Sequence, residues 1–145
     1  MMELLMYYLK NQLSRTGTKS LLGVGIALSL IAVSVGINDN LPGILLLFVG
    51  VISFFFAFVH HWKEAGQFGT LLAVSAISFP VLVLLHNIFD GLAGHLGPIP
   101  VLTQFLTGLS VISFFAAILL APAGIVIGIF AGLFYLFRRS SKSED

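Results

Sequence analysis

The chain has 145 residues, of which 58% are hydrophobic and 9% are charged, and its mean hydropathy is +1.07. Soluble domains carry about 25% charged residues, so this composition excludes a protein whose whole surface faces water. A net charge of +1 gives no reason to expect nucleic-acid binding. The absence of cysteine removes disulfides, thiolate metal sites and thiol nucleophiles. An integral membrane protein is the class that the composition favours.

Residues 1–19 precede the first apolar run and mix polar with apolar side chains. Leu5, Leu9 and Leu13 recur at four-residue spacing, with Lys10 among them. This pattern fits an amphipathic helix on the inner membrane surface, with its basic groups near anionic headgroups. A flexible N-terminal segment fits equally well, so both interpretations remain open.

The first apolar run covers residues 21–37 and carries no charge. At about 1.5 Å per residue it spans about 26 Å, which is at the short end for a membrane crossing. A cleaved signal peptide is the alternative, because basic residues precede the run and residues 32–34 have small side chains at cleavage spacing. We favour a retained crossing over the loss of residues 1–34, since the run is longer than a typical signal sequence.

The second run, residues 41–59, follows the polar turn 38–40 and begins with a proline in its first turn, where no N–H partner is needed. Gly43, Gly50 and Ala57 recur every seven residues. They place a stripe of small side chains along one face of this helix, which predicts close packing against a neighbour.

His60 and His61 end the second run, beside Trp62. Adjacent residues point in different directions on a helix, so we expect a solvated pair at the interface and no chelated ion. Aromatic side chains with a polar edge prefer membrane interfaces. The single tryptophan and the tyrosines all map to the same, inner boundary: Trp62, Tyr7, Tyr8 and Tyr135.

The third run covers residues 68–89 and contains Pro80, which predicts a kink because proline lacks an N–H and crowds the carbonyl of Ala76. Residues 91–104 follow and are rich in glycine and proline, so the sequence predicts an irregular loop there.

The fourth run, residues 105–137, is about 50 Å long if it forms one straight helix, against about 30 Å of hydrocarbon. It fits a long tilted helix bent near Ile118, four residues before Pro122. An interfacial piece followed by a normal crossing, or a re-entrant pair, would also account for the length. We favour the bent helix, and expect residues 138–145 to form a cytoplasmic tail.

The basic residues indicate how the four runs cross the membrane. If each run crosses once, every basic residue falls on one side, which is the positive-inside pattern. Both termini are therefore expected in the cytoplasm, in a protein of the cell membrane. The basic residues are Lys10, Arg15, Lys19, Lys63, Arg138, Arg139 and Lys142.

Gly124, Gly128 and Gly132 form a GxxxGxxxG motif in the fourth run. Four-residue spacing aligns them on one helix face, where the lack of side chains lets another backbone approach closely. We predict a glycine zipper that packs against a helix of the same chain, in preference to a dimer face.

His86, Asn87 and Asp90 form the candidate polar or ion site, with Asp39 and His95 as potential neighbours. A polar group at membrane depth is expensive to leave unpaired, so such groups are candidates for function. The simpler interpretation is that the third run has reached the outer interface. The spacing fits no metal site. The serines of the runs, Ser53 and Ser110 included, are expected to bond the backbone of their own helix.

The sequence Leu85–Phe89 (LHNIF), followed by Pro122–Gly124 and Gly128, resembles small four-helix membrane proteins of bacteria and archaea that are grouped as uncharacterised. The resemblance covers the second half of the chain. It implies this architecture and no particular activity.

The sequence thus predicts an all-α integral membrane four-helix bundle, formed as one membrane domain over residues 1–145 and packed through small residues. The expected function is structural or accessory, with a lipid or another membrane protein, or a second copy of the chain, as partner. The alternative is a small transporter or channel component for protons or cations. An enzyme is not expected, because no acid–base pair can be recognised, and neither a cofactor nor a metal is expected.

Overall fold

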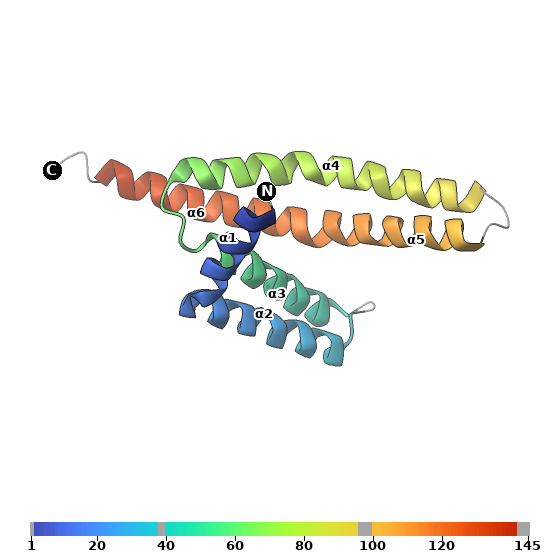
Figure 1. Ribbon diagram of the computed structural model, residues 1–145, viewed down its shortest axis with the longest axis horizontal. Helices are drawn as coiled ribbons and strands as arrows, with labels where there is room; N and C mark the ends of the chain where they lie inside the picture. Colours follow the sequence, from blue (N-terminus) through green and yellow to red (C-terminus); the bar gives the residue numbers. More distant parts are fainter. Residues whose placement is uncertain (1, 38–39, 96–99, 142–145) are drawn as a thin grey trace. The chain divides into compact units, whose positions relative to one another are not determined.

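The computed structural model describes residues 2–37, 40–95 and 100–141, and every regular element in these ranges is helical (Figure 1). The helices are α1 (Met2–Ser14), α2 (Thr16–Val35), α3 (Leu41–Val59), α4 (Ala65–His95), α5 (Pro100–Phe115), the π-helical turn η1 (Ala116–Leu120) and α6 (Ala121–Ser141).

Four stretches within these ranges are long and apolar enough to cross a membrane. They are Thr16–Val35, Leu41–Val59, Ala65–His95 and Pro100–Arg138. The prediction of an all-α chain with four apolar helices is therefore confirmed. The chain divides into two compact units, Met1–Lys63 and Glu64–Asp145. The expectation of a single membrane domain stays a prediction, because each unit is described by itself.

In the first unit α2 and α3 lie side by side as an antiparallel hairpin (Figure 1). Their closest approach is backbone on backbone, since a Cβ atom added to Gly43 would collide with the carbonyl group of Gly36. A Cβ on Gly25 would come within 3.1 Å of the Gly50 carbonyl oxygen. Gly36 itself ends α2 with a φ of 96°, a backbone conformation that favours glycine.

Two hydroxyl groups also join this hairpin across the interface. Thr18 Oγ1 donates to the carbonyl oxygen of Ala57 at 3.1 Å, and Ser53 Oγ donates to that of Leu21 at 2.9 Å. The bond from Ser53 corrects the expectation that this serine bonds its own helix. Close packing of small residues brings the Leu21 carbonyl within reach of the neighbouring helix, so the hydroxyl finds its acceptor there.

In the second unit α4 runs antiparallel to the continuous helical segment α5–η1–α6 (Figure 1). Near the start of α4, the rings of Phe68 and Tyr135 stack with centroids 5.5 Å apart and planes 10° from parallel. The π turn ends two residues before Pro122, and the N–H of Ala121 donates to the carbonyl of Ala116, five residues earlier. Pro122 has no N–H to donate to the carbonyl of Ile118, four residues earlier, and both a proline and a π turn can bend a helix. Pro80 lies inside α4.

The predicted irregular loop at residues 91–104 is largely wrong. Helix α4 continues to His95, and α5 begins at Pro100, so only residues 96–99 lie outside the described part. Proline suits the first turn of a helix, where its missing N–H has no partner. Gly91 and Gly94 each disfavour a helix by about 1 kcal/mol relative to alanine, and α4 nevertheless includes both.

Helix also extends beyond the first apolar run at its N-terminal side. Of residues 1–19, Met2–Ser14 form α1, and Thr16 already begins α2. With 20 residues, α2 is about 30 Å long, which matches the hydrocarbon thickness of a bilayer.

Candidate functional site

His86, in the second half of α4, reaches across to Ser110 on α5. Its Nδ1 atom lies 2.8 Å from the Ser110 hydroxyl oxygen and 3.1 Å from the Ser110 carbonyl oxygen. Ser110 is 2% exposed, while His86 is half-buried and its ring lies 5.2 Å from the ring of Phe114. Ser110 was expected to bond its own helix, and the structure corrects this.

Nδ1 of His86 has a hydrogen-bond partner on Ser110 whether or not it carries a hydrogen. A protonated Nδ1 donates to the carbonyl oxygen of Ser110, whereas a bare Nδ1 accepts from the hydroxyl group. The hydroxyl also lies 3.4 Å from the carbonyl oxygen of His86, its second acceptor. This geometry joins α4 to α5.

The other two residues of the predicted polar site do not join this pair. Asn87 is exposed, and its side-chain nitrogen donates to the carbonyl of Val83 in its own helix at 2.8 Å. Asp90 is exposed as well. His95 bonds the carbonyl of Gly91 through Nδ1 at 2.6 Å, and Asp39 lies outside the described residues. Among the described residues, no group of three His, Asp or Glu side chains is placed to hold a metal ion.

Gly124, Gly128 and Gly132 are all buried beside α4. A Cβ atom on Gly124 would collide with the hydroxyl of Ser75. A Cβ on Gly128 would lie 2.8 Å from the Cβ and 3.0 Å from the backbone nitrogen of Leu72, whereas one on Gly132 would make an ordinary 3.5 Å contact. The first two positions therefore require glycine more strictly than the third.

A second polar cluster, which the sequence analysis missed, lies in the first unit. Gln12 of α1 is 2% exposed, and its Nε2 atom lies 3.1 Å from Nε2 of His61, just beyond α3. Gln12 Oε1 and His61 Nδ1 are buried without a hydrogen-bond partner in the described part of the chain. The sequence carried a signal for this cluster, because Gln12 continues the helical spacing of the leucines in residues 1–19.

The two adjacent histidines differ in their surroundings. Nδ1 of His60 lies 2.9 Å from the carbonyl oxygen of Ala57, and the two rings meet nearly at right angles, with centroids 5.8 Å apart. The expected solvated pair is thus wrong for His61, whose ring turns toward α1. Partial burial, with smaller effects from Arg15 and His60, lowers the pKa of His61 below its ordinary value of 6.5.

Fold and site together define the class: an all-helical chain with four helices long and apolar enough to cross a membrane, and polar clusters that join neighbouring helices. Comparison of the chain with protein-family models, curated proteins and solved structures found no match.

Proposed function

We propose that the chain is a multi-pass protein of the cell membrane with both termini in the cytoplasm. Two observations support this topology. Every basic residue falls on one side if the four apolar helices each cross once. The rings of Phe68 and Tyr135 stack where α4 begins and α6 approaches its end, so these two helices reach the same membrane face together.

The second hairpin is longer than a bilayer is thick. Helix α4 has 31 residues and is about 46 Å long, and at a steep tilt of about 40° it still covers about 35 Å. The hydrocarbon layer measures about 30 Å. If α4 begins at the inner boundary and runs along the membrane normal, His86 lies about 32 Å along it, at the outer boundary. Asn87 and Asp90 then lie among headgroups or in water.

The function that we propose is that of a structural or accessory protein that binds a partner or lipid, and not that of an enzyme. The outer end of the second hairpin carries this proposal. Val101 is 79% exposed and Phe105 is 61% exposed, on a part of α5 that extends beyond the hydrocarbon in the proposed topology. Large apolar side chains exposed there favour an interaction with another molecule.

Photocrosslinking in intact cells tests this function. A photoreactive amino acid replaces Phe105, and the control carries it at Ile77, which is 66% exposed in the middle of α4. We expect a discrete protein or lipid-headgroup adduct at Phe105 and only acyl-chain adducts at Ile77. The same acyl-chain products at both positions would contradict the proposal.

The second candidate is a small transporter or channel component for protons or cations. The observation in its favour is the His86–Ser110 pair, because Nδ1 has a partner with or without a proton. Four helices enclose little space, so this function would require a second copy of the chain. Flux assays in liposomes separate the candidates. We expect no proton or cation flux above protein-free vesicles, whereas flux that is lost in both His86→Ala and Asp90→Asn would contradict the accessory function.

The helices are proposed to pack through small residues, with Gly124, Gly128 and Gly132 as a glycine zipper within the chain. The close approach of Gly124 to Ser75 and of Gly128 to Leu72 supports a seam between α6 and α4 inside the second unit. Because lipid offers no hydrophobic drive between helices, close packing of this kind is a main source of their association.

A further inference from the structure

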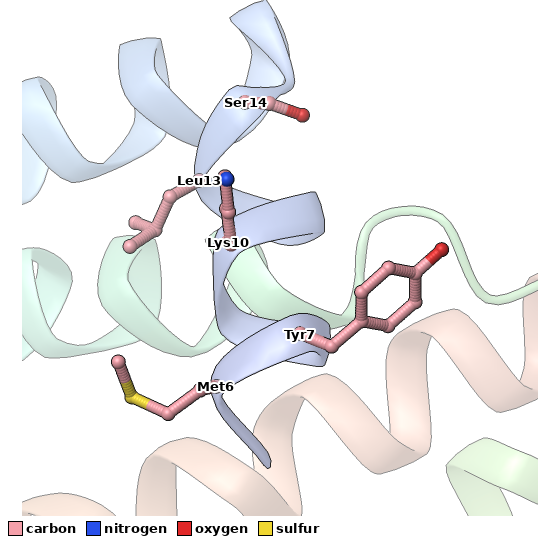
Figure 2. Close-up of a pocket in the computed structure, with 5 residues that line it drawn as sticks. All are labelled: Met6, Tyr7, Lys10, Leu13 and Ser14. Carbon is pink, nitrogen blue, oxygen red and sulfur yellow. The ribbon is translucent and has the colours of Figure 1, made fainter. Parts of the chain in front are cut away.

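Helix α1 carries an apolar and basic face that the other described residues of the first unit leave exposed. Met6, Tyr7, Lys10, Leu13 and Ser14 line an open hollow along it (Figure 2). Met6 is 63%, Tyr7 74% and Leu13 43% exposed. Figure 2 shows Met6 and Leu13 extending to one side of the helix and Tyr7 to the other, with Lys10 between them. We call these five residues the α1 outer face.

The contact between Gln12 and His61 fixes which way this face points. At about 100° per residue, Gln12 lies on the opposite side of α1 from Lys10. Its burial and its 3.1 Å contact with His61 hold that opposite side against the end of α3. The α1 outer face is therefore turned away from the hairpin of its own unit.

Basic residues outnumber acidic ones on and near this face. Lys10 lies in its centre, and Arg15 follows directly after α1. Lys63 comes shortly after α3, at the same end of the hairpin. The acidic residues nearby are Glu3, which lies on the same side of α1 seven residues before Lys10, and Glu64, which follows Lys63. A basic group among exposed apolar side chains complements a layer that is anionic at its surface and apolar just below it.

We propose that the α1 outer face binds the anionic phospholipid headgroups of the inner leaflet. Met6, Tyr7 and Leu13 enter the boundary between headgroups and acyl chains, and Lys10 contacts the phosphate groups. The proposal rests on the proposed topology, which places α1 at the cytoplasmic ends of α2 and α3. It gives the lipid-binding part of the proposed function a location and a lipid class.

The chain has no cysteine, so a single probe can test the contact in the full-length protein. Met6→Cys is labelled with an environment-sensitive dye in phosphatidylcholine vesicles with or without phosphatidylglycerol. Asn11→Cys is the matched control, because Asn11 is exposed and polar and lies outside the α1 outer face. We expect a blue shift and quenching by headgroup-proximal spin-labelled lipid for the Met6→Cys probe alone. Phosphatidylglycerol should strengthen both effects, and Lys10→Glu should abolish that gain.

Three results would overturn the proposal. The Met6→Cys probe could match the Asn11→Cys probe in its access to an aqueous quencher, which would show no lipid contact. The blue shift could be independent of phosphatidylglycerol, which would show that the face does not select anionic lipid. The blue shift could also vanish when single chains are isolated in nanodiscs, which would show that a second copy of the chain covers the face. The topology is tested separately by labelling Ser14→Cys in intact cells with a reagent added outside. Labelling there would contradict the proposed topology, whereas the contact with lipid could still be measured in vesicles.

Discussion

The two hairpins of this protein both pack apolar helices against each other, but their helices differ in length. In the first, α2 and α3 have 20 and 19 residues, and they are joined by hydroxyl groups that donate to carbonyls of the facing helix. In the second, α4 has 31 residues and faces a 39-residue apolar stretch, Pro100–Arg138. There, glycines of α6 pack against side chains of α4. The His86–Ser110 pair joins α4 to α5 in the second half of α4.

Both hairpins combine close contacts at small residues with hydrogen bonds between helices. Without a hydrophobic drive in lipid, association depends on close contact and on hydrogen bonds between helices. In the short hairpin both kinds of contact lie along the interface between α2 and α3. The long hairpin places its glycine contacts in the inner part of the proposed crossing and its polar pair at the outer boundary, which leaves the outer end of the hairpin for other interactions.

The largest expected effect is in the short hairpin. A Cβ at Gly43 meets the carbonyl of Gly36 and lies 3.3 Å from the carbonyl oxygen of Ala32, and both obstacles are backbone atoms. Gly43→Ala should lower the free energy of unfolding by about 1–3 kcal/mol, the usual cost of overpacking. Gly23→Ala is the control, because nothing lies within 4 Å of its Cβ. Denaturant titration in micelles measures both, and equal stability of the two variants would contradict the close approach.

In the long hairpin, glycines should differ among themselves. Gly128→Ala places a Cβ 3.0 Å from backbone atoms of Leu72, and should also lower the free energy of unfolding by about 1–3 kcal/mol. Gly132→Ala makes an ordinary contact with Phe68 and should be neutral, or stabilising by up to about 1 kcal/mol from helix propensity. Thermal unfolding in micelles tests the order. A Gly132→Ala variant as unstable as Gly128→Ala would show that the register of α4 against α6 is different.

The hydrogen bonds between helices should be worth less than the glycine contacts. Thr18→Val and Ser110→Ala remove such bonds, one from each hairpin, and each should lower the free energy of unfolding by about 0.6 to 1.7 kcal/mol. Ser34→Ala is the matched control, because the hydroxyl of Ser34 is exposed and bonds Leu30 of its own helix. If that control loses as much stability, the crossing bonds have no special value.

The smallest expected effect is a pH dependence of α1 in the first unit. The pKa of His61 is lowered while α1 is docked, so a released His61, with its ordinary value of 6.5, binds a proton more readily. Docking is therefore fully stable above pH 6.5 and weakens as the pH falls through this value. Hydrogen exchange of α1 amides, corrected for intrinsic rates, should rise on acidification. The rise should disappear in His61→Gln and persist in His60→Gln, and its persistence in His61→Gln would exclude the mechanism.

The sequence predicts the helices well because hydropathy over a membrane-length window is a property of the segment alone. It fails where structure depends on a facing helix. Glycine and proline near residues 91–104 indicate a loop in isolation, but each is compatible with a helix end that packs against another. His86 could be singled out from its depth in an apolar run, yet its partner Ser110 could not, since 24 residues separate them. Gln12 and His61 are 49 residues apart and meet only because α1 folds back on α3.

The central claim is the topology of four crossings with both termini in the cytoplasm, and single-cysteine labelling in intact cells tests it most directly. Asn40→Cys and His95→Cys should react with a membrane-impermeant maleimide added outside. Ser14→Cys, Lys63→Cys and Arg138→Cys should react only after the cells are permeabilised. Reaction of Lys63→Cys or Arg138→Cys in intact cells, or protection of His95→Cys there, would contradict the proposed topology.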